Sequence, residues 1–314
     1  MKPTTGSVAL ALALALTTAQ LGCDRPPPPL PPVNLAAYAD TLAQFRALVH
    51  GVMASPDGFV SVVGLFWLKP GENRLGADSA FEVALPALHA PHRLGTVRLE
   101  HDSAWFTAAA GARATAGGLP VTTLRLRSDD EPNPTMLWSG SLQVSLLARD
   151  HRLALRVKDT LSPAIAAFEG HRYFPTDTAW RLPARFVKRA RPDSIKIMDV
   201  LGFEAWAPWP GDVEFFVHGT RYALHAFYQP GGHPSEGLFL LFRDRTNGEE
   251  SYEAMRYLDA PVPDSLGRMV LDFNAAYNPP CVYSRFATCP LPPRDNTLPI
   301  RVTAGEMKPA RHGS

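Results

Sequence analysis

Residues 59–73 read FVSVVGLFWLKPGEN, and this stretch indicates the class of fold. From Phe59 to Leu68 nearly every side chain is apolar, and most are β-branched or aromatic. Such a run, bounded by turn residues, predicts a buried strand. The following residues, 69–73, include Pro70 and Gly71 and predict a turn.

Downstream of this strand, short apolar runs alternate with Gly, Pro, Asp and Asn, and no long helical period interrupts them. Regular short strands separated by turns are typical of antiparallel sandwiches. We therefore expect a mainly β protein, with an antiparallel β-sandwich in the N-terminal half and a β-rich C-terminal half. The expected strands cover residues 81–85, 95–99, 104–108, 121–126, 142–147, 153–157, 184–188, 195–199, 205–207, 213–217, 222–227, 238–242, 270–273 and 300–303.

Upstream of the quoted stretch, one short helix is expected. Asn34 is a good N-cap residue, and apolar side chains recur behind it at spacings of three and four as far as Val49. Residues 55–58 (SPDG) have turn chemistry and end the helix. The apolar stripe consists of Leu35, Tyr38, Leu42, Phe45 and Val49.

The composition permits a sizeable core and argues against one class of partner. Hydrophobic residues make up 46% of the 314 residues and charged residues 19%, which is a normal globular balance. The net charge is +1, and no basic block occurs. We therefore expect no nucleic-acid partner, because such partners need a basic surface.

The first 22 residues have the features of an export signal. Lys2 precedes an apolar run at residues 8–16 (VALALALAL) that is too short to span a bilayer. The sequence QLGC at residues 20–23 resembles a bacterial lipobox, which implies that Cys23 is lipidated and becomes the mature N-terminus. Ordinary secretion is the alternative. Asp24 resembles the inner-membrane retention signal of some Gram-negative lipoproteins.

These features predict the domain organisation and the location. A signal peptide (1–22) precedes a lipid anchor with a Pro-rich spacer (23–33), which includes RPPPPLPP at 25–32 and favours polyproline II. A helix plus sandwich (34–165), a β-rich half (166–308) and a disordered tail (309–314) follow. We expect a protein of the cell envelope, held on the periplasmic face of a membrane by its lipid.

Several segments together resemble the domain of unknown function 1684 family. The longest matching segment is LDFNAAYNPPC at residues 271–281, which continues into ATCPLPP at residues 287–293. The resemblance covers residues 35–308, and the family has no assigned activity. The other matching segments are residues 61–76 (SVVGLFWLKPGENRLG), 173–175 (YFP) with 180–181 (WR), 242–248 (FRDRTNG) with Tyr252 and 256–258 (RYL), and Asn296, Leu298 and Pro299.

The first half also resembles, distantly, a forkhead-associated sandwich. NRLGAD at residues 73–78, the strand end at Leu85 and Pro86, and His92 occur in the expected order. Those domains bind phosphothreonine through an Arg directly after the Gly, but here Ala77 follows Gly76. The resemblance therefore implies a fold and does not imply phosphopeptide binding.

Cys281 and Cys289 are the only cysteines besides Cys23. Two cysteines eight residues apart in an exported chain predict a disulfide, which would pin the Pro-rich loop around them. Free thiols and a metal site are the alternatives. No histidine lies close to either cysteine, so we expect no metal and no cofactor.

The family segments carry a cluster of polar residues that is the best candidate ligand site in the sequence. Asp272 and Asn274 alternate with apolar residues and are expected on one face of a strand. Asp272 and Arg256 are expected to form a buried ion pair. The alternative is that the cluster ties a loop to the sheet through buried hydrogen bonds. Its members are Arg243, Asp244, Tyr252, Arg256, Asp272, Asn274, Tyr277 and Asn278.

Three functions remain open at this point. The first is an envelope lipoprotein that binds a small molecule, a glycan or an envelope component. The second is an envelope hydrolase that uses the C-terminal polar cluster, which a carboxyl group of raised pKa in a cleft would favour. The third is an accessory lipoprotein that stabilises a membrane complex. Sequence patterns do not name a ligand or a catalytic residue.

Overall fold

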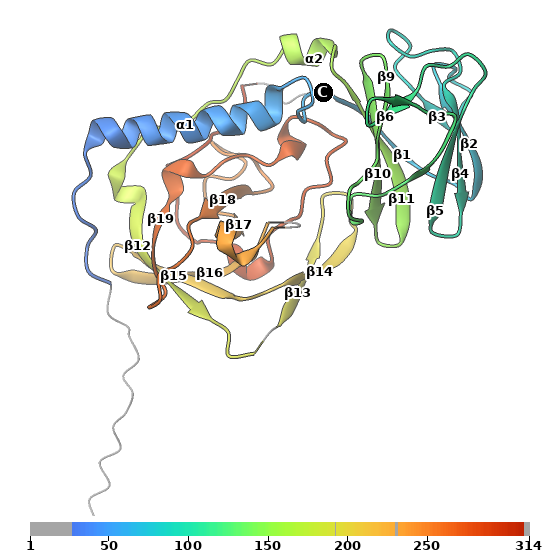
Figure 1. Ribbon diagram of the computed structural model, residues 1–314. Helices are drawn as coiled ribbons and strands as arrows, with labels where there is room; N and C mark the ends of the chain where they lie inside the picture. Colours follow the sequence, from blue (N-terminus) through green and yellow to red (C-terminus); the bar gives the residue numbers. More distant parts are fainter. Residues whose placement is uncertain (1–26, 192, 230–231, 311–314) are drawn as a thin grey trace, which may run out of the picture.

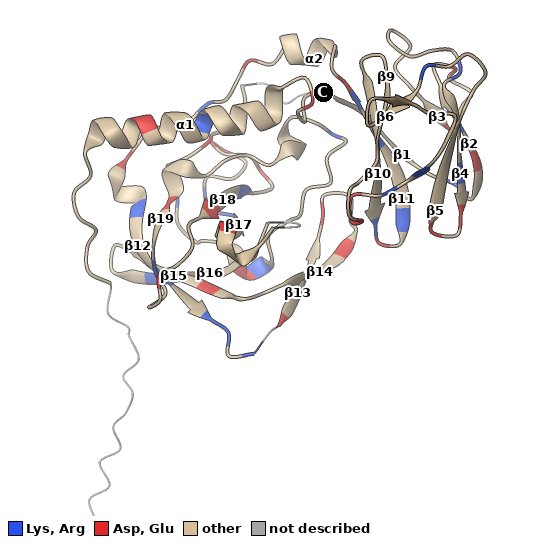
Figure 2. Ribbon diagram, in the orientation of Figure 1, with Lys and Arg blue, Asp and Glu red and all other residues tan. Residues whose placement is uncertain are grey.

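The computed structural model describes residues 27–191, 193–229 and 232–310, and the predicted signal peptide and Cys23 lie outside them. The protein is mainly β, as predicted, with antiparallel pairing throughout the named strands except between β2 and β3. Figure 1 shows an N-terminal sandwich beside a larger C-terminal body, with helix α1 lying across the latter. Basic and acidic residues are interspersed along the ribbon of both parts (Figure 2).

The N-terminal sandwich consists of two sheets that share one core. Apolar side chains from both sheets, including Leu75, Phe106 and Leu155, are completely buried between them. The first sheet has the order β1 (Val62–Trp67), β11 (Arg152–Asp159), β10 (Leu142–Arg149), β9 (Met136–Ser139), β6 (Thr115–Ala116), β7 (Leu119–Pro120). The second has the order β3 (Val83–Ala84), β2 (Gly71–Gly76), β4 (Gly95–Glu100), β5 (Ser103–Ala108), β8 (Thr123–Leu126).

Strand β11 has an apolar face and a cationic face. Leu155 and Val157 are fully buried in the sandwich core. Arg156 and Lys158 alternate with them, so they project from the opposite face of the sheet. That face is directed toward the C-terminal body, because Arg156 reaches the side chain of Thr288 there.

The C-terminal body is built from three smaller sheets around its own core. Fully buried Phe215, Leu240 and Phe273 form part of that core. The main sheet has the order β16 (Thr220–Ala226), β15 (Gly211–Val217), β12 (Arg181–Lys188), β19 (Arg268–Asp272). The other two are the pairs β13 (Ser194–Met198) with β14 (Glu204–Pro208), and β17 (Leu238–Phe242) with β18 (Arg256–Ala260).

Short helical turns complete the described part of the chain. Helix α2 (Pro163–Ala166) lies in the connection between the two bodies. The 3-10 turns are η1 (Thr178–Trp180), η2 (Pro234–Glu236), η3 (Phe273–Ala275), η4 (Pro280–Val282) and η5 (Arg294–Asn296).

Helix α1 (Leu35–Ala54) begins as the sequence predicts. The Asn34 side chain accepts hydrogen bonds from the backbone N–H groups of Ala36 and Ala37 at 3.0 and 3.1 Å. The helix continues one turn beyond the expected end at Val49, to Ala54. The sequence grouped this helix with the N-terminal sandwich, but the helix packs on the C-terminal body. The ring centroids of Phe45 and Tyr277, for example, lie 6.0 Å apart.

The chain turns back sharply after α1, and Gly58 permits this turn. A Cβ atom at Gly58 would lie 2.6 Å from the backbone oxygen of Met53, which is closer than real Cβ contacts. The following backbone then bonds to the last turn of the helix, with Val60 N–H donating to Met53 O at 2.8 Å. This return places Phe59 beside the end of α1.

Several segments differ from the sequence predictions. Residues 71–76 form a strand, β2, where residues 69–73 predicted a turn; pairing with β4 overrides the local turn chemistry, and Asn73 bonds to the backbone oxygen of Val97 at 3.2 Å. Strands β6, β7, β9 and β18 were not expected; they are two to five residues long, and β18 (RYLDA) is buried at four of its five positions although it contains two charged residues. Residues 300–303 form no strand, although Val302 is buried against the core.

Candidate functional site

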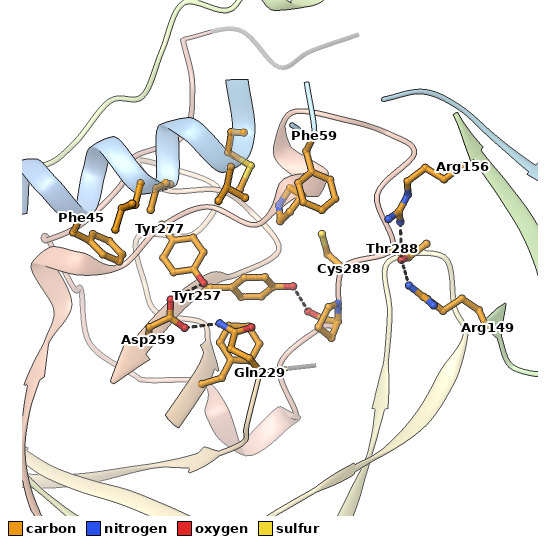
Figure 3. Close-up of a pocket in the computed structure, with 17 residues that line it drawn as sticks. Phe45, Phe59, Arg149, Arg156, Gln229, Tyr257, Asp259, Tyr277, Thr288 and Cys289 are labelled. Carbon is orange, nitrogen blue, oxygen red and sulfur yellow. Dashed lines mark hydrogen bonds between the residues drawn. The ribbon is translucent and has the colours of Figure 1, made fainter. Parts of the chain in front are cut away.

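A cavity of about 520 Å³ lies where α1, the C-terminal body and the N-terminal sandwich meet. The last three turns of α1 form one wall, and strands β17 and β18 form the floor with Tyr277. The loop 288–290 and the sandwich residues Arg149 and Arg156 close the far end (Figure 3). The site therefore draws on segments that are far apart in the sequence.

Most of the lining is apolar. From α1, Val49 and Met53 are buried at the wall, whereas Leu48 and Val52 are 71% and 56% exposed at the rim. An exposed Leu and Val beside a recess leave apolar surface available to a bound molecule. The helix face that the sequence marked as an amphipathic stripe thus reaches the cavity through Phe45 and Val49.

The floor is an aromatic cluster. The Tyr257 ring packs edge-on against Phe239, with centroids 4.9 Å apart, and against Tyr277 at 5.9 Å. The Tyr257 hydroxyl donates to the backbone oxygen of Pro290 at 2.9 Å, which fixes the ring against the loop. Edge-to-face contacts of this kind hold aromatic side chains in one geometry, so the floor is preformed.

One end of the cavity is cationic. Arg149 and Arg156 each donate to the Thr288 hydroxyl at 3.3 Å, as the dashed lines in Figure 3 show. Arg149 also forms an ion pair with Asp129 at 2.8 Å. For Arg156 the described residues provide no carboxylate partner, and its Nε is buried without a hydrogen bond. Desolvation, with the charge of Arg149 adding to it, lowers the pKa of Arg156 to about 10, so the group keeps its charge at neutral pH.

Among the described residues, one acidic side chain, Asp259, lines the opposite end of the cavity. The Asp259 carboxylate accepts hydrogen bonds from the side-chain amide of Gln229 at 2.5 Å and from the Tyr277 hydroxyl at 3.1 Å. Asp259 is partly exposed to solvent, but the surrounding chain desolvates its carboxylate, and this raises the pKa of Asp259. The two hydrogen bonds act in the opposite direction and lower it in part. Figure 3 shows both partners directed at Asp259.

The eight residues of the predicted polar cluster do not form one site. Tyr277 is the member that lines the cavity. Arg256 pairs with Asp244 at 2.5 Å, and both side chains are completely buried, so the predicted pair with Asp272 is wrong. Arg243 donates to the backbone oxygen of Ala254 at 2.6 Å. These contacts tie loops to the sheet, which is the structural alternative that the sequence left open.

Asp272 and Asn274 also have structural partners. Asp272 ends β19 and caps the turn η3, which contains Asn274; the prediction that both lie on one strand is therefore wrong, because the strand stops at Asp272. Asp272 accepts a hydrogen bond from the Tyr38 hydroxyl of α1 at 2.7 Å. Asn278 donates its backbone N–H to the buried carboxylate of Glu306 at 2.8 Å.

The predicted disulfide is not formed in the structure, where Cys281 and Cys289 are free thiols. The prediction that they lie together is nevertheless correct, because the Cys281 N–H donates to the Cys289 sulfur at 3.2 Å. The Cys281 sulfur lies 3.7 Å from the Tyr252 hydroxyl. Cys289 lines the cavity. Hydrogen bonds from Cys289 and then Tyr252 lower the pKa of Cys281, although burial opposes them.

Sequence reasoning missed the polar residues of the cavity: Arg149, Arg156, Gln229 and Asp259. Period-two alternation along residues 153–158 places Arg156 on the face opposite Leu155. Nothing in the pattern shows that this face meets residue 288, which lies in the other body. Among the described residues, no group of three His, Cys, Asp or Glu side chains is arranged to hold a metal ion. No described helix is long and apolar enough to cross a bilayer.

These features define a class: a mainly β protein of two bodies that share an apolar cavity with one cationic and one acidic end. Comparison with known proteins then gives the family. The protein family of unknown function DUF1684 matches residues 166–307. An uncharacterised protein of Haloarcula marismortui, solved by NMR, is 35% identical over 48% of this chain and 82% of its own, with a TM-score of 0.40. The chain therefore belongs to this family through its C-terminal half.

Two further comparisons add little. A structure of a forkhead-associated domain, described in terms of phosphothreonine-dependent interactions, aligns at 16% identity over 30% of this chain and 92% of its own. Its TM-score of 0.21 is too low to support any statement about this chain. The chain matches no curated protein.

Proposed function

We propose that this protein binds a small, largely apolar molecule in the cavity between α1 and the C-terminal body. The observation that carries the proposal is the character of the site: a recess of about 520 Å³ with an aromatic floor, an aliphatic helix wall and polar groups at its two ends only. Sites for small molecules typically have about 300–1,000 Å³, apolar walls and a few placed polar groups. Both the size and the lining support this class of function.

A hydrolase is the competing proposal, and Asp259 is the observation that favours it. Its raised pKa, in a recess, suits a group that holds a proton. General acid–base chemistry on a bound ester or glycoside also needs a second group in reach. Among the described residues that line the cavity, Asp259 is the sole carboxylate and no histidine occurs. Burial raises the pKa of the Cys289 thiol, which makes it a poor nucleophile. Binding is therefore the better-supported function.

We place this binding function in the cell envelope, on the strength of the export signal and the lipobox-like QLGC at residues 20–23. A lipid on Cys23 and the Pro-rich spacer would hold the cavity near a membrane, where apolar molecules concentrate. The test is metabolic labelling with a fatty-acid analogue in a Gram-negative host. We expect label on the wild-type chain, which the Cys23→Ser variant should lose. A soluble, unlabelled wild-type protein would contradict the anchor.

The binding proposal is tested with a neutral fluorescent probe, N-phenyl-1-naphthylamine, on the full chain carrying Cys23→Ser. We expect saturable fluorescence and displacement by neutral alkanols. A Val52→Trp substitution at the rim of the cavity should weaken probe binding about tenfold or more, because the indole fills the opening.

The matched control for this test is Leu35→Trp. Leu35 is on the same helix and is 68% exposed, but it lies away from the cavity. The control should bind the probe like the parent protein. The binding proposal fails if no probe saturates, or if both tryptophan variants behave alike.

A further inference from the structure

We infer that the bound molecule is an amphiphile with one anionic group, a carboxylate or a phosphate monoester, which is held by Arg156 and Arg149 while its apolar part lies on the aromatic floor. The inference rests on the proposed binding function and adds the chemical class of the ligand. It also assigns head-group recognition to the N-terminal sandwich, which lies outside the part of the chain that matches the family.

Two guanidinium groups lie side by side at one end of the cavity. Arg149 is the last residue of β10, and Arg156 lies on the adjacent strand β11. Thr288 belongs to a loop of the opposite body. The Nη2 atoms of Arg149 and Arg156 each lie 3.3 Å from its hydroxyl oxygen (Figure 3). Two donors from one sheet therefore converge on one point at the end of the cavity. A hydroxyl there can also donate to a ligand oxygen.

The positive charges at this end of the cavity are incompletely balanced. Arg149 has a carboxylate partner, Asp129, but Arg156 has a neutral hydroxyl and an unsatisfied Nε. Lys158 adds another cation on the same face of β11, and the ring of Phe59 lies 5.8 Å from Arg156 and 5.6 Å from Lys158. Asp129 and Asp57 offset these half-buried like charges only in part, because neither forms an ion pair with Arg156, and incompletely paired buried charges are costly. A carboxylate or phosphate would satisfy the free donors in a forked geometry that guanidinium groups favour.

The opposite end of the cavity is acidic. Asp259 carries the other charge that lines the cavity, and its hydrogen bonds to Gln229 and Tyr277 hold it in place. A second anionic group at this end would meet a carboxylate and be disfavoured. A ligand whose second end is uncharged or cationic would not be repelled by Asp259. The site therefore selects against molecules with an anion at both ends.

The test compares matched ligands that differ in the head group alone: decanol, decanoate and decyl phosphate, each displacing N-phenyl-1-naphthylamine from the full chain with Cys23→Ser. We expect decanoate or decyl phosphate to bind about tenfold or more tightly than decanol, as charge-assisted hydrogen bonds to a half-buried arginine would give. The Arg156→Gln substitution should remove this preference while decanol still binds. Whichever anion binds more tightly identifies the head group.

The control is Arg152→Gln. Arg152 is on the same strand and the same face as Arg156, but it stacks over Trp67 at 4.6 Å and does not line the cavity. This variant should keep the preference for the anion. Salt dependence gives a measurement that needs no variant. Added NaCl should weaken the binding of decanoate more than the binding of decanol.

The outcomes separate the two proposals. If decanol displaces the probe and neither anion binds more tightly, the anion inference is wrong and the cavity remains a binding site. If nothing displaces the probe or the probe does not bind, the binding function itself fails. If Arg152→Gln removes the preference as completely as Arg156→Gln, general surface charge explains the effect and the inference is wrong.

Discussion

The guanidinium Nη2 of Arg256 lies 2.5 Å from Oδ2 of Asp244, and both side chains are completely buried. Arg256 also donates to the backbone oxygens of Val302 and Ala304, at 2.8 and 2.5 Å. Asp244 accepts the backbone N–H of Thr246 at 2.7 Å. Desolvation lowers the pKa of Arg256, and the facing Asp244 opposes that shift. The pair thus connects β18 to two irregular segments inside the C-terminal body, away from the cavity.

Breaking this pair should destabilise the protein strongly. Arg256→Met leaves the Asp244 carboxylate buried without its partner, and such losses cost about 3–5 kcal/mol. Urea unfolding of the variant should show a loss of that size in the free energy of unfolding, with the midpoint at lower urea. The double variant Asp244→Leu with Arg256→Met removes both charges, so it should lose less than the sum of the two single variants. Additive losses would contradict a direct interaction between the two groups.

The hydrogen bond from Tyr38 to Asp272 should hold α1 on the C-terminal body. Burial and the neighbouring Asp272 raise the pKa of Tyr38, so its hydroxyl stays protonated and donates. Tyr38→Phe should cost about 1–2 kcal/mol, because the acceptor is charged, and it should weaken the binding of the neutral probe.

Thr41→Ala provides the control for this helix. Its hydroxyl is exposed and bonds to the backbone of the same helix, to Ala37 O at 2.9 Å. Its loss should change neither unfolding nor probe binding appreciably. Equal probe affinity in the wild type and Tyr38→Phe would show that the cavity wall does not depend on this tether.

His225 predicts a pH dependence of stability. Its Nδ1 lies 2.6 Å from Asp212, and this hydrogen bond, with Asp295 adding to it, raises the pKa of His225 against the opposing effect of burial. The folded-state pKa therefore lies above the unfolded value of 6.5. The stabilisation is fully present below about pH 6.5 and is lost as the pH rises through the folded-state pKa.

The measurement is urea unfolding of the wild type and His225→Gln across that range. The wild type should exceed the variant most at about pH 5.5, and the difference should shrink above neutrality. A difference that grows with pH would mean that His225 is stabilised in its neutral form. His233, which is exposed and bonds to Ser235, offers a control substitution at a histidine of the same body.

The elements that the sequence predicted are those in which local pattern and burial agree. The Asn34 cap and the apolar stripe of α1 are local features, and β10 and β11 have alternating apolar residues that fill one core. Strand β2 was missed, because its pairing with β4 stabilises a segment whose glycines read as a turn. Local patterns carry no information on such pairing energies.

The candidate site was harder to predict because its residues come from separate bodies. The polar residues of the family segments were predicted to form a ligand site. Asp244, Arg256 and Asn278 are instead buried with structural partners and do not line the cavity. Arg156 and Asp259 were not singled out, because Arg156 reads as an ordinary charged residue of a strand and the segment that contains Asp259 was not predicted to be a strand. Only the packing of the two bodies places Thr288 against Arg156.

The two neighbouring thiols should differ in reactivity. Hydrogen bonds from Cys289 and Tyr252 lower the pKa of Cys281, whereas burial raises that of Cys289. In the Cys23→Ser protein, iodoacetamide should modify Cys281 first, since the thiolate is the nucleophile. Tyr252→Phe should slow that reaction without exposing Cys289, and Cys281→Ser should leave one slow thiol that a bound alkanol protects. Mass spectrometry of the labelled protein gives the order of modification. If no free thiol is found even after denaturation, the cysteines are paired in the isolated protein, and the disulfide expected from their spacing forms after all.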